Sequence, residues 1–122
     1  MIARLACELV EATDRVRFRT GSRIASYYGR GESTEGYRCR YGLNPEFQAA
    51  LVSGPLRASA DDAAGEIRAV ELDDHPFFVA TLFQPERAAL QNHVPPLVTA
   101  FVRSSAAHAA QASHAARMSQ FR

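Results

Sequence analysis

The sequence predicts an α/β domain with a mixed sheet, and three kinds of pattern carry that prediction. Two segments, Arg15–Arg19 and Tyr37–Tyr41, alternate in polarity with the period of two that marks a half-buried strand. A third segment, Phe77–Phe83, is apolar on both faces apart from one threonine, which is typical of a central strand. Two proline-led helix starts, Asn44-Pro45 and Pro95-Pro96, supply the helical part.

The first third of the chain combines strands with one short helix. Leu5–Val10 is apolar with a polar interruption, which fits either a strand or a short helix. Asp14 begins a predicted turn before the strand at Arg15–Arg19. Ser22 is suited to cap a helix that runs to Tyr28, because a serine oxygen can accept a hydrogen bond from the first turn of a helix.

The middle of the chain continues with a helix and three strands. Asn44 is suited to cap a helix that runs to about Val52. Strands are predicted at Leu56–Ala60, Ile67–Leu72 and Phe77–Phe83, the last as the central strand. The links between strands are short, and short links favour hairpins, so several strand pairs should be antiparallel.

The C-terminus reads as one long helix with two parts. Its first part has an apolar stripe made of Leu97, Val98, Phe101 and Val102. Beyond Arg103 the residues are mainly alanine, serine, histidine and glutamine, which have little apolar surface to bury. We therefore divide the chain into a folded portion, residues 1–105, and an Ala-rich helical tail, residues 106–122. The tail is either a frayed extension or an interface helix.

Composition narrows the classes of function. The chain has 122 residues, 47% of them hydrophobic, which suffices for one domain with a core. A net charge of +1 gives no reason to expect a nucleic-acid partner, and there is no apolar run of the ~20 residues that cross a membrane. The N-terminus lacks the order of a signal peptide, and the two cysteines lack metal-ligand spacing. We therefore expect a cytoplasmic protein without a metal or cofactor.

Several motifs occur in a specific order along the chain. Tyr37–Tyr41 leads into Gly42-Leu43-Asn44-Pro45, and Glu66–Leu72 is followed by His75-Pro76-Phe77-Phe78-Val79. The last strand ends in Phe83-Gln84-Pro85-Glu86. From about residue 4 to residue 105, this series resembles the C-terminal part of the class I glutamine amidotransferase domain of CTP synthases. The resemblance implies a flavodoxin-like α/β fold, a place in pyrimidine metabolism and, in the family, a glutaminase reaction.

The resemblance implies a catalytic group that this chain has lost. In the family a cysteine attacks the glutamine amide, a histidine acts as base, and a glutamate orients the histidine. By position the base corresponds to Gln84 and the orienting residue to Glu86. A glutamine side chain takes no proton near neutral pH, and loss of a general base typically costs ~10²–10⁴-fold in rate. The Gly-x-Cys-x-Gly elbow of the nucleophile is absent from the sequence, which suggests a truncated domain.

Two arginines are the candidate ligand-binding residues. Arg40, and more weakly Arg38, correspond to the strand in which the family holds the carboxylate of glutamine. A guanidinium suits that task because it can bind a carboxylate with two hydrogen bonds. The alternative is that both are exposed strand arginines. His75 lies a strand's length from Glu86 and is not expected to replace the missing base.

Three functional hypotheses follow. The first is an amidotransferase-like protein without competent glutaminase chemistry, which binds glutamine or a related small molecule. The second is a glutamine-hydrolysing half that an upstream segment or a partner chain completes. The third is a non-catalytic interaction module. Under each, a homo-oligomer or a partner chain would cover the apolar surface that a partial sheet leaves open.

Overall fold

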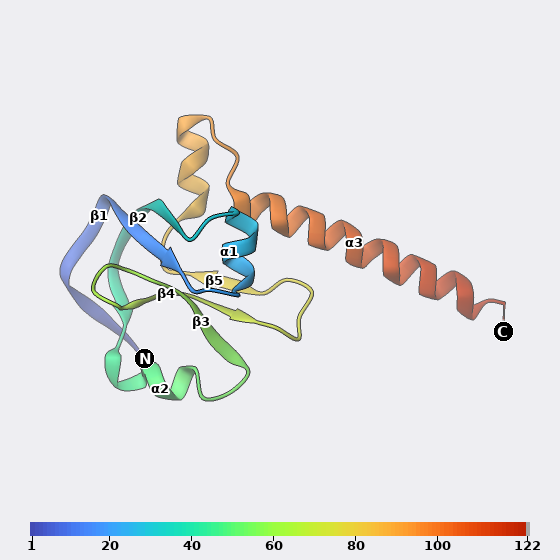
Figure 1. The fold of residues 1–122 in the computed structure, drawn as a ribbon, viewed down its shortest axis with the longest axis horizontal. Coiled ribbons are helices and arrows are strands. Elements are labelled where there is room, and N and C mark those ends of the chain that lie inside the picture. Colours follow the sequence, from blue (N-terminus) through green and yellow to red (C-terminus); the bar gives the residue numbers. More distant parts are fainter. Residues whose placement is uncertain (122) are drawn as a thin grey trace.

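The computed structural model describes residues 1–121, and it leaves out the side chains of residues 6–10 and of Arg40. It is an α/β domain, as predicted, with a strongly curled sheet and one projecting helix (Figure 1). The elements in chain order are β1 (Ile2–Phe18), α1 (Arg23–Tyr28), β2 (Glu32–Leu43), a 3-10 helix η1 (Pro45–Phe47), α2 (Gln48–Leu51), β3 (Leu56–Asp61), β4 (Ile67–Leu72), β5 (Val79–Thr81), a second 3-10 helix η2 (Pro85–Gln91) and α3 (Pro96–Ser119).

The described strands form one sheet in the order β2-β1-β3-β4-β5, and every pairing is antiparallel. β1 and β2 make a long two-stranded ribbon, whereas β1 joins β3 only through Arg17 and Phe18. The predicted turn at Asp14 is wrong, because Asp14 pairs with Glu35 within the ribbon. The two predicted N-terminal segments are therefore parts of one strand.

The prediction of a central strand at Phe77–Phe83 is also wrong. β5 comprises only Val79–Thr81 and lies at the end of the strand order. Of the apolar residues on either side of it, Phe77 and Phe83 are covered by other elements, whereas Phe78 is exposed. Phe77 packs between Tyr27 of α1 and Phe101 of α3, with ring centroids 5.5 Å apart in both pairs. An apolar run can thus arise from packing against helices at its ends, without strands on both sides.

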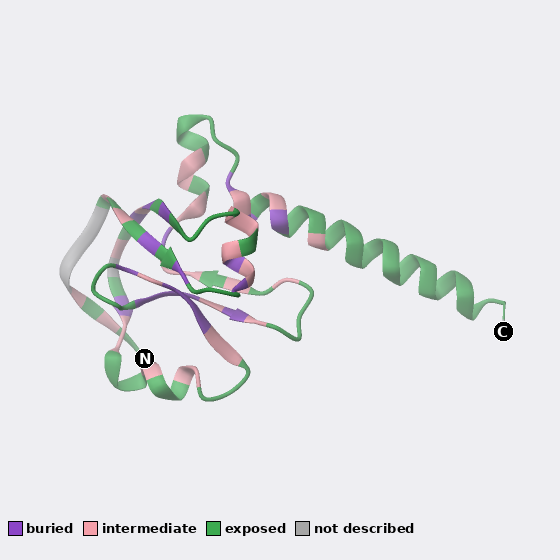
Figure 2. Cartoon of the chain, viewed as in Figure 1, coloured by how far each residue is buried: buried purple, intermediate pink, exposed green. Residues whose placement is uncertain are grey.

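The core lies between the inner side of the curled sheet, α1 and the start of α3 (Figure 2). Phe18 of β1 packs on Tyr28 of α1, with ring centroids 4.5 Å apart. The buried residues of this core are Val16, Phe18, Ile24, Tyr37, Ala60, Ala69, Phe83 and Leu97. The sheet and the helices therefore bury their apolar faces against each other.

The predicted helix caps are confirmed. The Ser22 hydroxyl accepts a hydrogen bond from Ala25 N at 3.2 Å, and Asn44 Oδ1 accepts one from Glu46 N at 3.0 Å. α1 ends at Gly29, whose φ of 65° suits a residue without a side chain. The helix predicted to run to Val52 is divided into η1 and α2.

A buried carboxylate fastens α1 to the sheet. Glu71 of β4 has no exposed surface. Its oxygens accept hydrogen bonds from Arg23 N at 2.9 Å and from Arg57 Nη2 at 2.7 Å. The start of α1 is thereby held on β4, which positions the helix over the core.

Helix α3 extends away from the rest of the molecule (Figure 1). Leu97 is buried in the core, whereas Val98, Phe101 and Val102 stay about half exposed. The predicted apolar stripe is therefore only partly used in packing. Within the described residues, no helix is long and apolar enough to cross a membrane.

Candidate functional site

The segment after β5 closes the curled sheet. Leu82 N donates a hydrogen bond to Arg68 O of β4 at 2.8 Å, and Gln84 N donates one to Gly36 O of β2 at 2.9 Å. Residues 82–84 therefore connect the two ends of the strand order, β5 and β2. Phe83 points into the core and meets Tyr37 edge to face, with ring centroids 6.3 Å apart.

The predicted catalytic residues follow this closure directly. Gln84 is half-buried and precedes η2, and Glu86 lies exposed in the first turn of η2. Neither side chain has a polar partner among the residues that the structure describes. His75 stays local, as expected: its Nδ1 accepts a hydrogen bond from Phe77 N at 3.1 Å. The site roles of Gln84 and Glu86 remain predictions.

The predicted ligand-binding arginine Arg38 forms an ion pair near the same closure. Its Nε lies 3.4 Å from Glu11 Oε1. Arg87, on η2, donates a hydrogen bond from Nη2 to the other oxygen, Glu11 Oε2. One carboxylate thus joins β2 to the segment that carries Gln84 and Glu86. Arg40, the stronger candidate, lies outside the described residues, because its side chain is not described.

Gly36 explains how η2 can come so close to β2. A Cβ atom at Gly36 would lie 2.9 Å from Arg87 Cδ and 3.0 Å from Arg87 Nε. The stem of Arg87 therefore packs directly over the bare backbone of Gly36. A larger residue at this position would push Arg87 away from Glu11.

Glu11 and Arg87 were not among the residues predicted from the sequence. Arg87 directly follows the segment Phe83-Gln84-Pro85-Glu86, and this position in the sequence could have marked it as a candidate site residue. Glu11 gave no signal, because its direction depends on an irregularity in the β1–β2 ribbon. The register shifts between Val10 and Ala12, and Glu11 has a φ of 51°, in the left-handed region.

An open cleft of about 560 Å³ borders this group of charges. Its walls come from β1, β2, η2 and the end of α1. Its lining residues include Glu11, Gly36 and Arg87 together with Tyr28, Arg30 and Glu35. The cleft is large enough for a small metabolite, and charged groups of both signs lie along it.

Tyr28 and Glu35 are two neighbouring polar residues of the cleft, of which Glu35 is buried. The Tyr28 hydroxyl is buried and makes no hydrogen bond of normal geometry with the described residues. Burial, and then the nearby Glu35 carboxylate, raise the pKa of Tyr28. The Tyr28 phenol therefore stays neutral at ordinary pH.

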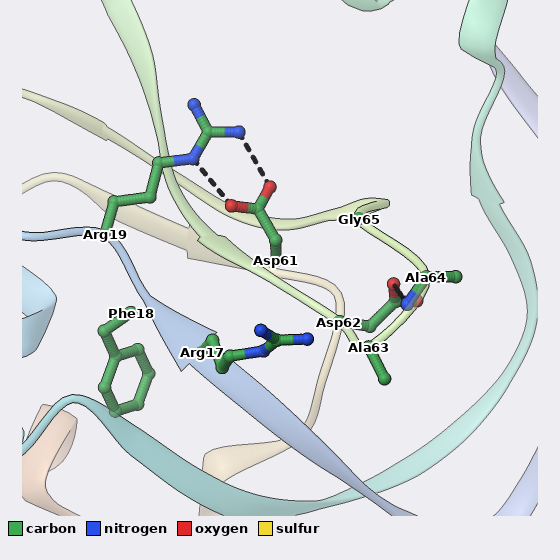
Figure 3. A pocket seen from close by; sticks show the side chains of 8 residues that line it. All are labelled: Arg17, Phe18, Arg19, Asp61, Asp62, Ala63, Ala64 and Gly65. Atoms are coloured by element: carbon green, nitrogen blue, oxygen red, sulfur yellow. Dashed lines mark hydrogen bonds and ion pairs between the residues drawn. The ribbon is translucent and has the colours of Figure 1, made fainter.

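A second hollow, of about 540 Å³, lies where β1 meets the turn between β3 and β4 (Figure 3). Three of its four charged residues, Arg19, Asp61 and Asp62, already have partners in the fold. Arg19 binds Asp61 through two hydrogen bonds of 2.7 and 2.8 Å, and Asp62 accepts one from Ala64 N at 2.9 Å. We therefore do not regard this hollow as the functional site. No cluster of metal-ligating side chains occurs in the part of the chain that the structure describes.

The fold is that of a glutaminase domain. The structure superposes on the "CTPS - glutaminase domain with bound acivicin" of Trypanosoma brucei with a TM-score of 0.73. The match covers 83% of this chain and 40% of that chain, with 24% sequence identity. The chain thus has the fold of part of a class I glutamine amidotransferase domain.

Sequence comparison identifies the family more closely than the fold does. The chain is 40% identical to CTP synthase of Treponema pallidum over 83 residues, and 40% identical to CTP synthase of Aeropyrum pernix over 93 residues. These matches cover 67% and 75% of this chain, but only 14% and 17% of the two relatives. No family model matches the chain. The chain is a relative of CTP synthase and corresponds to part of its glutaminase domain.

Proposed function

We propose that this chain is a glutamine amidotransferase-like protein that binds glutamine or a related small molecule and does not hydrolyse it. One observation supports the proposal: Gln84, which corresponds by sequence to the family's base, lies at a closure of the sheet that also brings η2 beside Arg38. A glutamine side chain at that place cannot accept a proton near neutral pH. By analogy with its relatives, we assign the role to pyrimidine metabolism in the cytoplasm.

A glutaminase assay tests the absence of catalysis. We expect the purified chain to release no ammonia from L-glutamine above background. Release that disappears in Glu86→Ala would overturn this part of the proposal. It would favour a glutamine-hydrolysing half whose Gln84 is tolerated.

Isothermal titration with L-glutamine tests the binding. We expect millimolar or tighter affinity in the wild type and weaker binding in Arg38→Ala and Arg40→Ala. Arg103→Ala is the matched control, because Arg103 is an exposed arginine on α3, away from the cleft. Absence of heat at millimolar glutamine, or equal affinity in all four proteins, would contradict a binding role for the strand arginines.

We also propose that a second copy or a partner chain covers part of the sheet. A small apolar hollow of about 130 Å³ supports this proposal, with Ile2, Leu43, Leu51, Ile67 and Leu82 among its lining residues. Exposed apolar surface of this kind is commonly covered in an assembly. Sedimentation equilibrium should show a species heavier than 13.4 kDa, whereas a monomer at all concentrations would exclude self-association.

A further inference from the structure

Glu11 is aimed at two arginines by an irregular backbone. It lies where the register of the β1–β2 ribbon shifts, and its φ of 51° falls in a region that L-residues other than asparagine and aspartate rarely adopt. A bulge of this kind turns a side chain away from the regular alternation of a strand. The consequence is that the Glu11 carboxylate lies over β2 and η2.

Each oxygen of this carboxylate faces a different arginine. Oε1 lies 3.4 Å from Arg38 Nε, and Oε2 accepts a hydrogen bond from Arg87 Nη2. The two guanidinium groups come from separate elements, β2 and η2, which the hydrogen bond between Gln84 and Gly36 holds together. Two arginines converging on one carboxylate make a receptor for that group.

The carboxylate in this receptor can be exchanged. The side chains of Glu11 and Arg38 are 55% and 68% exposed, and that of Arg87 is 26% exposed. Exposed ion pairs gain little from each other, because water solvates both partners when they separate. Glu11 and Arg87 both line the cleft of about 560 Å³, so that a small ligand has room beside them.

We propose that Arg38 and Arg87 form a binding site for the carboxylate of a small amino-acid ligand, and that Glu11 occupies this site from within the chain when the ligand is absent. The inference rests on the proposed function, since it specifies which arginines receive the carboxylate. It adds a regulatory contact, because the ligand must displace Glu11 and the free protein therefore binds more weakly than its arginines allow.

Titration of the full chain with L-glutamine tests the proposal. Removing the charge in Glu11→Gln should tighten binding by roughly 3- to 10-fold, as expected for the release of two exposed ion pairs. The gain should disappear in Glu11→Gln combined with Arg87→Ala. Glu32→Gln is the matched control and should leave affinity unchanged, because Glu32 is equally exposed and pairs with Arg15 at 3.9 Å elsewhere on the ribbon.

A second ligand separates this effect from a general change in charge or folding. L-glutaminamide lacks the carboxylate, and Glu11→Gln should not bind it more tightly than the wild type does. Equal and measurable affinity of wild type and Glu11→Gln for L-glutamine would overturn the Glu11 inference and leave the proposed function standing. Failure of both proteins to bind L-glutamine at millimolar concentration would overturn both.

Discussion

Two arginine–carboxylate groups in this molecule contain the same chemistry in opposite surroundings. In the first, Arg68 and Asp62 have side chains only 5% and 8% exposed, and they bind through hydrogen bonds of 3.0 and 2.8 Å. In the second, the exposed Glu11 lies between Arg38 and Arg87. The difference shows that burial decides whether such a group supports the fold or remains available to a ligand.

The buried group is also saturated with partners. The other oxygen of Asp62 accepts hydrogen bonds from Ala64 N and Glu66 N, both at 2.9 Å. The guanidinium of Arg68 also lies 5.7 Å from the ring centre of Tyr37. Both oxygens of Asp62 and two nitrogens of Arg68, Nε and Nη2, are therefore already bonded within the turn between β3 and β4.

The largest expected effect comes from breaking the buried pair. Asp62→Ala should lower the free energy of unfolding by roughly 2–4 kcal/mol, because the buried Arg68 then keeps only the half-exposed carboxylate of Glu66, 3.0 Å from its Nη2, as counter-charge. Urea denaturation measures this value. Glu11→Ala is the control and should change it by less than about 1 kcal/mol. A loss below that level for Asp62→Ala would show that water replaces the carboxylate.

Acid should weaken the buried group selectively. Burial alone would raise the pKa of Asp62, but hydrogen bonds from Glu66 N, Arg68 and Ala64 N, together with the charge of Arg68, lower it below its usual value. The stability that Asp62 supplies is therefore present above about pH 4 and is lost as the pH falls through the folded-state pKa. In Asp62→Asn this part of the acid dependence should be missing, whereas Glu11→Gln should retain it. Urea midpoints between pH 2 and pH 6 provide the measurement.

A smaller effect is expected at Gly36, where Arg87 of the exposed group packs on the backbone of β2. Gly36→Ala should displace Arg87, because the new Cβ would lie 2.9 Å from Arg87 Cδ. We expect a loss of roughly 1 kcal/mol in stability and a shift of the Arg87 Nε–H resonance in nuclear magnetic resonance spectra. Gly54→Ala is the control, since nothing lies within 4 Å of its added Cβ. An unchanged Arg87 resonance would indicate that its side chain is not held by Gly36.

The smallest expected effect is the coupling within the exposed group. A double-mutant cycle of Glu11→Ala and Arg38→Ala should give a coupling energy of about 0.2–1 kcal/mol that decreases with added salt. A coupling of several kcal/mol, insensitive to salt, would make the exposed group as structural as the buried one. It would then be a poor site for ligand exchange.

Local features of the fold could be predicted from the sequence because they depend on neighbouring residues. The caps at Ser22 and Asn44 and the strand Ile67–Leu72 occur where predicted. Each depends on hydrogen bonds or alternation within a few positions. The order of motifs also identified the family, and the comparisons confirm that relationship.

The predictions that failed concern contacts between distant parts of the chain. The sequence Phe77–Phe83 predicts a central strand, yet Phe77 packs on α1 and α3, and Phe83 packs on Tyr37 of β2. The turn expected at Asp14 is replaced by the long β1–β2 ribbon, in which pairing with β2 outweighs the local preference of aspartate.

The sequence by itself determined the family and most element types, because identity and local propensity are properties of the residues in order. Only the tertiary structure decided that Glu11 meets Arg38 and Arg87. That meeting requires a bulge in one strand and the packing of η2 on Gly36, and neither the direction of a side chain at a bulge nor a contact across 76 positions follows from local pattern.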